Sequence, residues 1–316
     1  MKKETKKPIL AIDIGGSKLI VGIVDHSGKV LLQEKVMLKK NTDEEYVFDT
    51  IIRKSYGLLD KLEGTAVGCA GVTIPGLADP DNGVWIYSCF SGLRNIKIGE
   101  ILFKQLRVPV FIENDVNACA YGEKVFGSCK DTSDYLWITV SNGIGGGIFI
   151  DGRLYPGPYK NAGEIGHVNV VENGHRCKCG NNGCLEVYAA GPAIVRRYRE
   201  KAGDKEENGA LSAKSIAKRA REGERLAGDI YRETGYYLGK AIASAVNIIN
   251  PQKVILGGGI AMDMDLFLPE LKDTVDQMIF KEANKYLVIE KTALSYNAAL
   301  IGAAAIAQKG MGGMYL

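Results

Sequence analysis

Residues 9–36 of the chain, ILAIDIGGSKLIVGIVDHSGKVLLQEKV, decide the fold. Two turns, Gly-Gly-Ser and Ser-Gly, divide this stretch into three apolar runs that are rich in Ile, Leu and Val. Apolar runs of this length between glycine turns are typical of β-strands in hairpins. The stretch therefore predicts three consecutive strands joined by tight turns.

The same arrangement returns between Tyr135 and Leu154. An apolar run (YLWITV) precedes a glycine-rich turn (SNGIGGG), and a second run (IFI) precedes an Asp-Gly turn and RLY. The 316 residues suit two domains of roughly 150 residues each. Two copies of one hairpin in such a chain predict a duplicated α/β domain with a ligand between the halves.

The rest of the chain alternates helical spacing with buried apolar runs. Helices are expected at residues 44–62, 98–106, 117–126, 221–249, 266–283 and 298–307. Strands are expected at residues 66–74, 108–114, 253–257 and 287–294, and a loop from Pro75 to Asn95.

Composition excludes several classes of protein. The net charge of +3 is spread over 40 basic and 37 acidic residues, so no basic field for nucleic acid is expected. The N-terminus lacks the apolar stretch of a signal peptide, and no run is long enough for a membrane span, which predicts a cytoplasmic protein. Seven cysteines argue against a disulfide framework. The scattered ones are expected to be buried small apolar residues: Cys69, Cys89, Cys119 and Cys129.

The remaining three cysteines form the strongest single motif. His167, Cys177, Cys179 and Cys184 bring one imidazole and three thiols within eighteen residues. Soft ligands of this type and number predict a closed, structural Zn²⁺ site, with metal-free buried thiols as the alternative. His175 competes for the histidine position, but its neighbours are typical of an exposed turn, so His167 is preferred.

Three glycine turns that follow strands predict a nucleotide site. Asp13 and the turn after it could hold Mg²⁺ through water and approach a phosphate by backbone N–H groups, although a tight hairpin needs the same glycines. Residues 143–147 (GIGGG) repeat the arrangement, and Gly258 lies in a third turn. None of the three is a P-loop or a Rossmann glycine motif.

Asp115 is the candidate for hydroxyl activation. It lies at a strand-to-helix junction, where open α/β sheets bind their ligands. Phosphoryl transfer to an alcohol needs a proton acceptor and little other covalent help. The alternative is that Asp115 only caps the following helix.

Six motifs in this order resemble the ROK family of bacterial sugar kinases, repressors and related proteins. They span nearly the whole chain, and the zinc segment with its preceding Gly-Glu-x-Gly-His is the most specific. The motifs are Asp13-Ile-Gly-Gly-Ser-Lys18, Pro75-Gly76, Glu113-Asn-Asp-Val-Asn117, Gly143-Ile-Gly-Gly-Gly147, Ala162-Gly-Glu-Ile-Gly-His167 and Cys177-x-Cys-Gly-x-x-Gly-Cys-Leu-Glu186.

The resemblance implies a two-lobed, actin-like, hexokinase-type (ribonuclease H-like) ATPase fold with a duplicated domain and an interlobe cleft for ATP and sugar. We expect a small lobe at 1–117, completed by a C-terminal helix at 297–316. A large lobe is expected at 118–296, with the zinc loop at 163–186. The implied homo-oligomer is a dimer or a tetramer.

The resemblance also assigns roles to residues. Asp115 falls on the catalytic base. The sugar contacts fall on Gly76, Asn114, Asp115, Glu164, His167 and Glu186. The contacts to ATP and its Mg²⁺ fall on Asp13, Gly15, Gly16, Ser17, Lys18, Gly143, Gly145 and Gly146. Beside the resemblance, Asn142 and Gly258 are expected nucleotide contacts because they lie in the second and third glycine turns. The zinc ligands fall on His167, Cys177, Cys179 and Cys184.

Three departures from the family pattern affect these assignments. Ser141-Asn142 replaces the usual Gly-Thr before GIGGG, although an Asn side chain can still bind phosphate. Residues 87–95 (YSCFSGLRN) lack the Asn-Leu and Trp found there in glucose kinases, which points to an altered substrate. Ala190 stands where serine is common.

The prediction is an ATP-dependent kinase for a hexose hydroxyl, with the 6-OH of glucose as the first candidate. Rival substrates are N-acetylmannosamine, N-acetylglucosamine, allose, fructose and a β-glucoside. A different class is a sugar-responsive transcriptional regulator. Because only twelve residues precede Asp13, a helix-turn-helix domain ahead of it is not expected. A catalytically idle sugar sensor is disfavoured by the intact Asp115.

Overall fold

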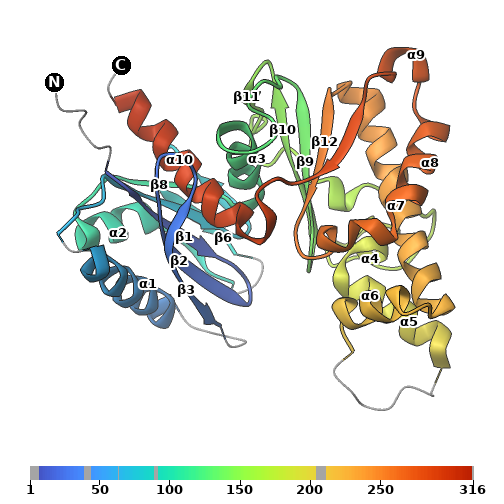
Figure 1. Cartoon of the computed structure of the whole chain (residues 1–316), viewed down its shortest axis with the longest axis horizontal. Helices are drawn as coiled ribbons and strands as arrows, with labels where there is room; N and C mark the ends of the chain where they lie inside the picture. The colour runs from blue at the N-terminus through green and yellow to red at the C-terminus, as the bar shows by residue number, and fades with distance from the viewer. Residues whose placement is uncertain (1–6, 39–43, 63, 89–91, 204–210, 315–316) are drawn as a thin grey trace. The chain divides into compact units, whose positions relative to one another are not determined.

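The computed structural model describes residues 7–38, 44–62, 64–88, 92–203 and 211–314, and these divide into two compact units (Figure 1). Unit 1 contains Met1–Asp131, Gly157–Asn161 and Tyr296–Leu316. Unit 2 contains Thr132–Pro156 and Ala162–Ser295. Cys89 and part of the 87–95 segment lie outside the described residues.

The main sheets of the two units share one strand order, β3-β2-β1-β4-β8 in unit 1 and β11-β10-β9-β12-β13 in unit 2. In each sheet the first three strands pair antiparallel and the last three pair parallel. The strands of unit 1 are β1 (Ile9–Ile14), β2 (Lys18–Val24), β3 (Val30–Met37), β4 (Cys69–Ile74) and β8 (Val110–Asn114). Those of unit 2 are β9 (Tyr135–Val140), β10 (Ile144–Ile150), β11 (Arg153–Leu154), β12 (Lys253–Gly257) and β13 (Val288–Lys291). The duplication predicted from the two glycine hairpins is therefore present in the topology.

Strand β1 is apolar at nearly every position because both faces of its sheet are covered. Leu10 and Ile12 pack with α1 (Glu44–Leu59) and α2 (Ile98–Leu106) on one face. Ile9 and Ala11 pack with α10 (Ala298–Met314) on the other. Since side chains alternate along a strand, Asp13 belongs to the same face as Ile9 and Ala11.

Helix α10 approaches the sheet of unit 1 very closely. A Cβ added at Gly71 of β4 would lie 1.8 Å from the carbonyl oxygen of Ala303. A Cβ at Gly302 would lie 2.3 Å from the carbonyl oxygen of Ala118, in helix α3 (Asp115–Val125). Helix α3 therefore belongs to unit 1, and the unit runs to Asp131, beyond the boundary of 117 expected from the sequence.

We expect Gly71→Ala to destabilise the protein by about 3 kcal/mol or more, because the backbone of α10 must move to admit the methyl group. Gly57→Ala is a matched control. Gly57 lies in α1 with no atom within 4 Å of its added Cβ, so alanine should stabilise the helix by up to about 1 kcal/mol. Urea unfolding of both variants checks this; equal free energies of unfolding would contradict the close approach.

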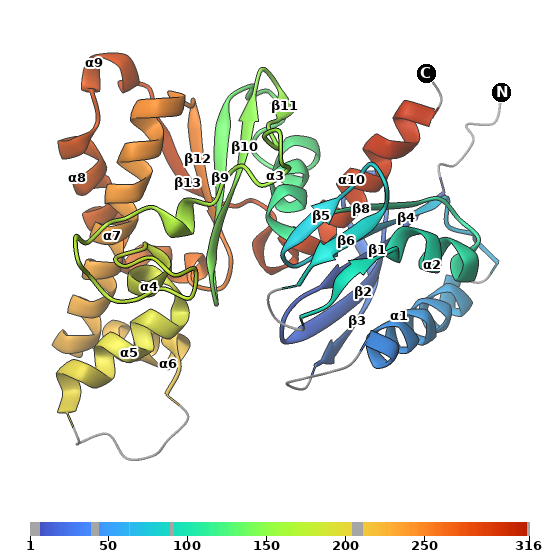
Figure 2. The same cartoon turned by 180° about the vertical axis from the view of Figure 1, so that it is seen from behind.

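The segment expected as a loop from Pro75 to Asn95 contains a small antiparallel sheet (Figure 2), so that prediction was wrong. Its strands are β5 (Leu77–Asp79), β6 (Val84–Tyr87) and β7 (Arg94–Ile96). Trp85 of β6 is buried and donates a hydrogen bond to the carbonyl oxygen of Pro75 at 3.0 Å. Strands of three or four residues are too short to show a clear alternation in sequence.

The segment Gly157–Asn161 lies between two parts of unit 2 in the sequence, yet it belongs to unit 1. Lys160 forms ion pairs there with Asp81 and Asp79. The Asp81 carboxylate is the main cause of a raised Lys160 pKa. The ion pairs explain why this short segment joins unit 1.

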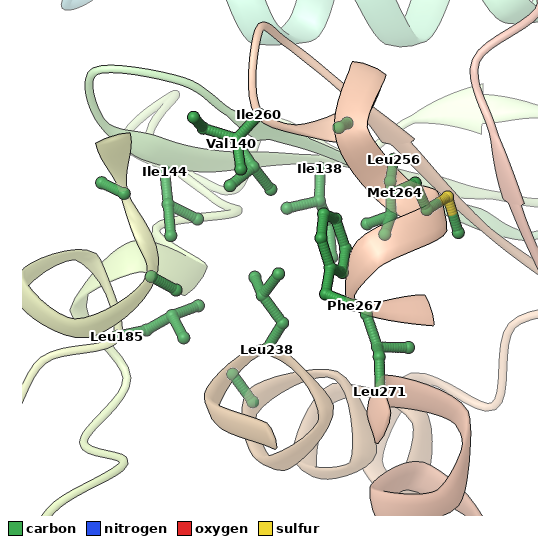
Figure 3. Packing of buried hydrophobic residues seen from close by; sticks show 14 of the residues in the cluster. Ile138, Val140, Ile144, Leu185, Leu238, Leu256, Ile260, Met264, Phe267 and Leu271 are labelled. Carbon is green, nitrogen blue, oxygen red and sulfur yellow. The ribbon is translucent and has the colours of Figure 1, made fainter. Parts of the chain in front are cut away.

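The helices of unit 2 pack around α7. Leu238 of α7 belongs to one buried cluster with Ile138 and Leu256 from the sheet and Phe267 beside α8 (Figure 3). The helices are α4 (Glu186–Ala189), α5 (Gly191–Ala202), α6 (Ala213–Arg221), α7 (Arg225–Ile249), α8 (Leu268–Met278) and α9 (Lys281–Asn284). Short 3₁₀ helices are η1 (Asp60–Leu62), η2 (Ile165–His167), η4 (Ala261–Leu266) and η5 (Ser295–Asn297).

The long helix expected at 221–249 begins later than predicted. Arg221 ends α6, and Gly223, with φ of +92°, turns the chain before α7 begins at Arg225. Asn250 ends α7 in the left-handed conformation, followed by Pro251. Within the described ranges, none of the helices combines the length and the apolar character that a membrane crossing requires.

Candidate active site and metal centre

Three parallel strands of unit 1 bring polar residues together where they end. β1, β4 and β8 are neighbours, with Asp13 opposite Thr73 and Ile74 opposite Asn114. The hydroxyl of Thr73 donates to Oδ1 of Asp13 at 3.0 Å, and Nζ of Lys18 lies 3.9 Å from Oδ2. Thr73 was missed in the sequence, because only the register of the strands reveals it.

The carboxylate of Asp13 is almost completely shielded from solvent. It is 5% exposed, and burial raises its pKa, while Lys18 and Thr73 act in the opposite direction. A bound divalent cation would lower this pKa again, because it favours the charged form. Asp13 therefore has the ligand chemistry that Mg²⁺ prefers.

The first glycine turn is tight. Gly15, Gly16 and Ser17 connect β1 to β2, and the amide of Gly15 donates to the carbonyl oxygen of Lys18 at 2.8 Å. Gly16 and Ser17 are exposed, whereas Lys18 is half-buried as the first residue of β2. The exposed part of this turn lies directly after Asp13.

Asn114, and not Asp115, caps helix α3. Oδ1 of Asn114 accepts from the amides of Val116 at 2.9 Å and Asn117 at 3.1 Å. Its Nδ2 donates to the carbonyl oxygen of Gly76 at 2.9 Å and to Oδ1 of Asp115 at 3.2 Å. Both ends of the Asn114 amide thus have partners in the protein, which suits a role in holding Asp115.

Asp115 is the first residue of α3 and is half-buried. Its Oδ1 accepts from the amide of Val116 at 3.0 Å as well as from Asn114. Burial raises the pKa of Asp115 to about 7, with the negative charge of Asp13 as the second cause. A carboxylate with a pKa near neutral pH has the proton affinity that suits a general base.

Two further residues support this junction. Glu113 accepts from the amide of Asn114 at 2.9 Å and from Nδ2 of Asn117 at 3.3 Å, and burial raises its pKa. Gly76 has φ of +91°, and a Cβ there would lie 2.3 Å from the carbonyl oxygen of Tyr87. Only glycine fits this position, from which the carbonyl group fixes Asn114.

In unit 2, His167, Cys177, Cys179 and Cys184 form one cluster, with a potential ligand atom from each residue within 4.8 Å of the others. Nδ1 of His167 lies 3.7 Å from Sγ of Cys177. Sγ atoms of Cys179 and Cys184 lie 3.6 Å apart. His175 is exposed, and its Nε2 contacts Arg196 at 2.9 Å, so the structure brings His167 to the thiols instead.

The cluster fits a tetrahedral zinc ion. Zn–S bonds of 2.3 Å at tetrahedral angles put sulfur atoms about 3.8 Å apart, close to the distances observed. Burial and the neighbouring thiols raise the pKa of Cys184 to about 12, so the thiolate is unfavourable without a cation. His167 turns Nδ1 towards the thiols, which leaves Nε2 3.8 Å from Oε2 of Glu164.

The second and third glycine turns lie together in unit 2, where the parallel strands β9 and β12 end. Residues 141–143 connect β9 to β10, and the side chain of Asn142 is exposed. In the third turn, a Cβ at Gly258 would lie 2.5 Å from the carbonyl oxygen of Val140. The amide of Ile260 donates to that oxygen at 3.0 Å, which joins the two turns.

The later glycines of GIGGG are strand residues. Gly145 and Gly146 lie in β10, and the amide of Gly146 donates to the carbonyl oxygen of Gly163 at 2.7 Å. A Cβ at Gly163 would lie 1.9 Å from the carbonyl oxygen of Gly146. Close packing between two backbone segments thus accounts for Gly146, whereas Gly143 lies in the turn itself.

Glu164 and Glu186 flank the metal cluster. Glu164 is exposed and faces His167, whereas Glu186 is half-buried at the start of α4. Oε2 of Glu186 accepts from the amide of Ile144 at 3.0 Å, a contact that spacing in the sequence does not suggest. Unit 2 therefore supplies a metal cluster with two carboxylates beside the second glycine turn.

Comparison with solved structures defines the class. Over 96% of its length the chain matches the whole of a ROK family glucokinase from Streptomyces griseus, solved in complex with glucose and AMPPNP, with a TM-score of 0.84 and 30% identity. The duplicated sheets and this likeness define a protein of the actin-like ATPase fold. The model of the ROK family matches residues 9–310, and the chain belongs to that family.

Similar relatives include an enzyme and a transcriptional regulator. The glucokinase of Thermotoga maritima is 33% identical over 98% of this chain and 99% of its own length. The DNA-binding transcriptional dual regulator NagC of Escherichia coli is 31% identical over 96% of this chain and 75% of its own length. The family therefore contains both enzymes and regulators similar to this chain.

Proposed function

We propose that this protein is an ATP-dependent hexose kinase in which Asp115 accepts the proton of the attacking hydroxyl, with the 6-OH of glucose as the first candidate. The observation that carries the proposal is the environment of Asp115. It is half-buried at a helix start, held by Asn114, with a pKa raised to about 7. Such a group is unprotonated often enough at neutral pH to accept a proton, and basic enough to do so effectively.

The other proposed site residues form two groups, one for ATP with Mg²⁺ and one for the sugar. Asp13, with Lys18 and the exposed part of the first turn, would hold Mg²⁺ and the phosphates of ATP, as would the turns at 141–143 and 258–259 in unit 2. When bound, Mg²⁺ supplies charge neutralisation for the transferred phosphoryl group. Glu164, His167 and Glu186 would accept and donate hydrogen bonds to sugar hydroxyls, with zinc holding the loop that carries them.

The relatives support the reaction class and leave several sugars as candidates. The Streptomyces griseus glucokinase was solved with glucose and an ATP analogue, and the Thermotoga maritima relative is a glucokinase. The rivals to glucose are the sugars named above: N-acetylmannosamine, N-acetylglucosamine, allose, fructose and a β-glucoside. We further propose a cytoplasmic homodimer or homotetramer, with ATP and sugar as its ligands and without nucleic acid or a membrane as a partner.

A second candidate function is sugar-responsive regulation, because NagC is a similar relative. Its requirements differ from those of a kinase, since a regulator needs sugar binding but not proton transfer. The pKa of Asp115, raised to about 7, suits proton transfer, which only the kinase needs, and therefore favours the kinase. A mobility-shift assay with DNA from the protein's own operon would reveal binding if regulation were the function.

The test is a coupled assay of ADP formation with each of the six sugars. We expect one sugar to give ADP and sugar phosphate in a one-to-one ratio, with Mg²⁺ required, because the phosphoryl group passes from ATP to the hydroxyl. The position of the phosphate is then determined by NMR. The proposal would be contradicted if none of the six sugars stimulated the formation of ADP. It would also be contradicted if no ADP formed with any of them.

A further inference from the structure

The segments on both sides of the metal cluster pack against the hairpin of β9 and β10. Upstream of His167, a Cβ at Gly166 would lie 2.1 Å from the carbonyl oxygen of Ile144. Downstream of Cys184, the amide of Gly191 donates to the carbonyl oxygen of Ser141 at 2.8 Å. The second glycine turn is therefore enclosed by the chain that leads into and out of the metal loop.

Within this packing, one side chain holds the turn. Oε2 of Glu186 accepts from the amide of Ile144, the first residue after the turn, at 3.0 Å. The same oxygen would lie 2.7 Å from a Cβ at Gly143. Among the described residues, apart from the two chain neighbours of Gly143, only Glu186 has an atom within 4 Å of that added Cβ, and Gly143 does not have a left-handed φ. The missing side chain of Gly143 thus makes room for the Glu186 carboxylate alone.

We propose that Glu186 is a positioning residue for the nucleotide, whose carboxylate fixes the turn at residues 141–143 through the amide of Ile144. The inference deepens the proposed function and rests on it, since it needs that turn to meet the phosphates of ATP. The sugar contact proposed above would use only one of the two carboxylate oxygens of Glu186. Oε2 is engaged by the turn, so Glu186 serves the nucleotide even when no sugar is bound.

The physical reason is preorganisation. A turn that has to be ordered on binding costs affinity, whereas a turn already held by a charge-assisted hydrogen bond does not. The hydrogen bond from the amide of Ile144 also compensates part of the negative charge of the Glu186 carboxylate. This orients the carboxylate towards the protein backbone, which limits its repulsion of a bound phosphate.

The experiment measures the affinity for AMPPNP with Mg²⁺ by calorimetry, without sugar, in wild type and three variants. We expect Glu186→Ala to bind roughly tenfold more weakly, because the hydrogen bond that orders the turn is lost. Gly143→Ala should weaken binding to a similar extent by displacing the carboxylate. Glu186→Gln retains an acceptor oxygen and should recover most of the affinity, which a purely charge-dependent role would not allow.

The double variant Glu186→Ala/Gly143→Ala separates two explanations. If Gly143 acts through Glu186, the double variant binds no more weakly than Glu186→Ala, because the methyl group then meets no carboxylate. The inference would be overturned if the losses of AMPPNP affinity in the two single variants added up in the double variant. It would also be overturned if folded Glu186→Ala bound AMPPNP as tightly as wild type. A wild-type protein that binds no nucleotide would instead overturn the proposed function. Thermal unfolding of each variant verifies that the fold is intact.

Discussion

Replacing Asp115 by Asn is expected to lower kcat by about 10²–10⁴ while sugar binding is retained, because the amide keeps the size of the carboxyl group but cannot accept the proton. The wild-type kcat/KM should rise with pH through about 7, since the protonated form of Asp115 is inactive. This rise should be absent from the residual activity of the variant. Stopped assays across pH 5.5–9 and sugar titration by calorimetry measure both effects.

The same variant should not lose stability. Because the folded pKa of Asp115 lies above its ordinary value, ionising the group in the folded protein costs free energy, and stability falls as pH rises towards 7. Asp115→Asn removes that cost and should unfold at the same or a higher temperature at pH 8. Asp49→Asn removes only an exposed ion pair with Arg53 on α1. It is the control and should leave activity unchanged and stability within about 0.5 kcal/mol. Unchanged turnover in Asp115→Asn would remove the residue from the mechanism.

Loss of the metal is expected to have the largest effect on stability. The purified protein should contain one zinc per chain. Removing the zinc should lower the unfolding temperature by more than about 10 °C, because the binding free energy of a structural zinc ion is as large as the free energy of unfolding of a typical domain. Sugar affinity should fall with it, since His167 and Glu164 lie on the loop that the ion would hold. Metal analysis and calorimetry on the same samples measure the effects.

Two histidines of one loop provide the matched pair for this prediction. His167→Ala should lose zinc, whereas His175→Ala should keep it, because His175 contacts Arg196 away from the thiols. The comparison separates ligation from general damage to the loop. A zinc-free protein with wild-type unfolding temperature and sugar affinity would refute the structural role.

Much of the fold follows from the sequence because its signals are local. The glycine hairpins at the start of each unit predict the duplication, which the common strand order confirms. The apolar strands and the stop of α7 at Asn250 are equally local features. The sheet of β5, β6 and β7 was missed because its strands are too short to carry a period. The metal cluster was predicted from its unusual composition, and the structure assembles it.

Other features of the site depend on distances that a sequence does not contain. Asn114 and Asp115 are adjacent, and only the hydrogen bonds show that Asn114 is the cap and Asp115 the residue it holds. Thr73 meets Asp13 across 60 positions through strand register. Glu186 meets Ile144 across 42 positions through the folding of the metal loop. The roles of these residues in ATP and sugar binding stay predictions that the variants above test.

The discontinuity of unit 1 has a consequence for biosynthesis. Its sheet emerges from the ribosome before unit 2, whereas α10, which covers one face of that sheet, is made after unit 2. Until then the apolar residues of β1 that face α10 lack their cover, and the exposed face is prone to aggregation. Unit 2 emerges in between and has its own core, so it can fold earlier. Unit 1, which carries Asp115, is thus completed only after unit 2 has been synthesised.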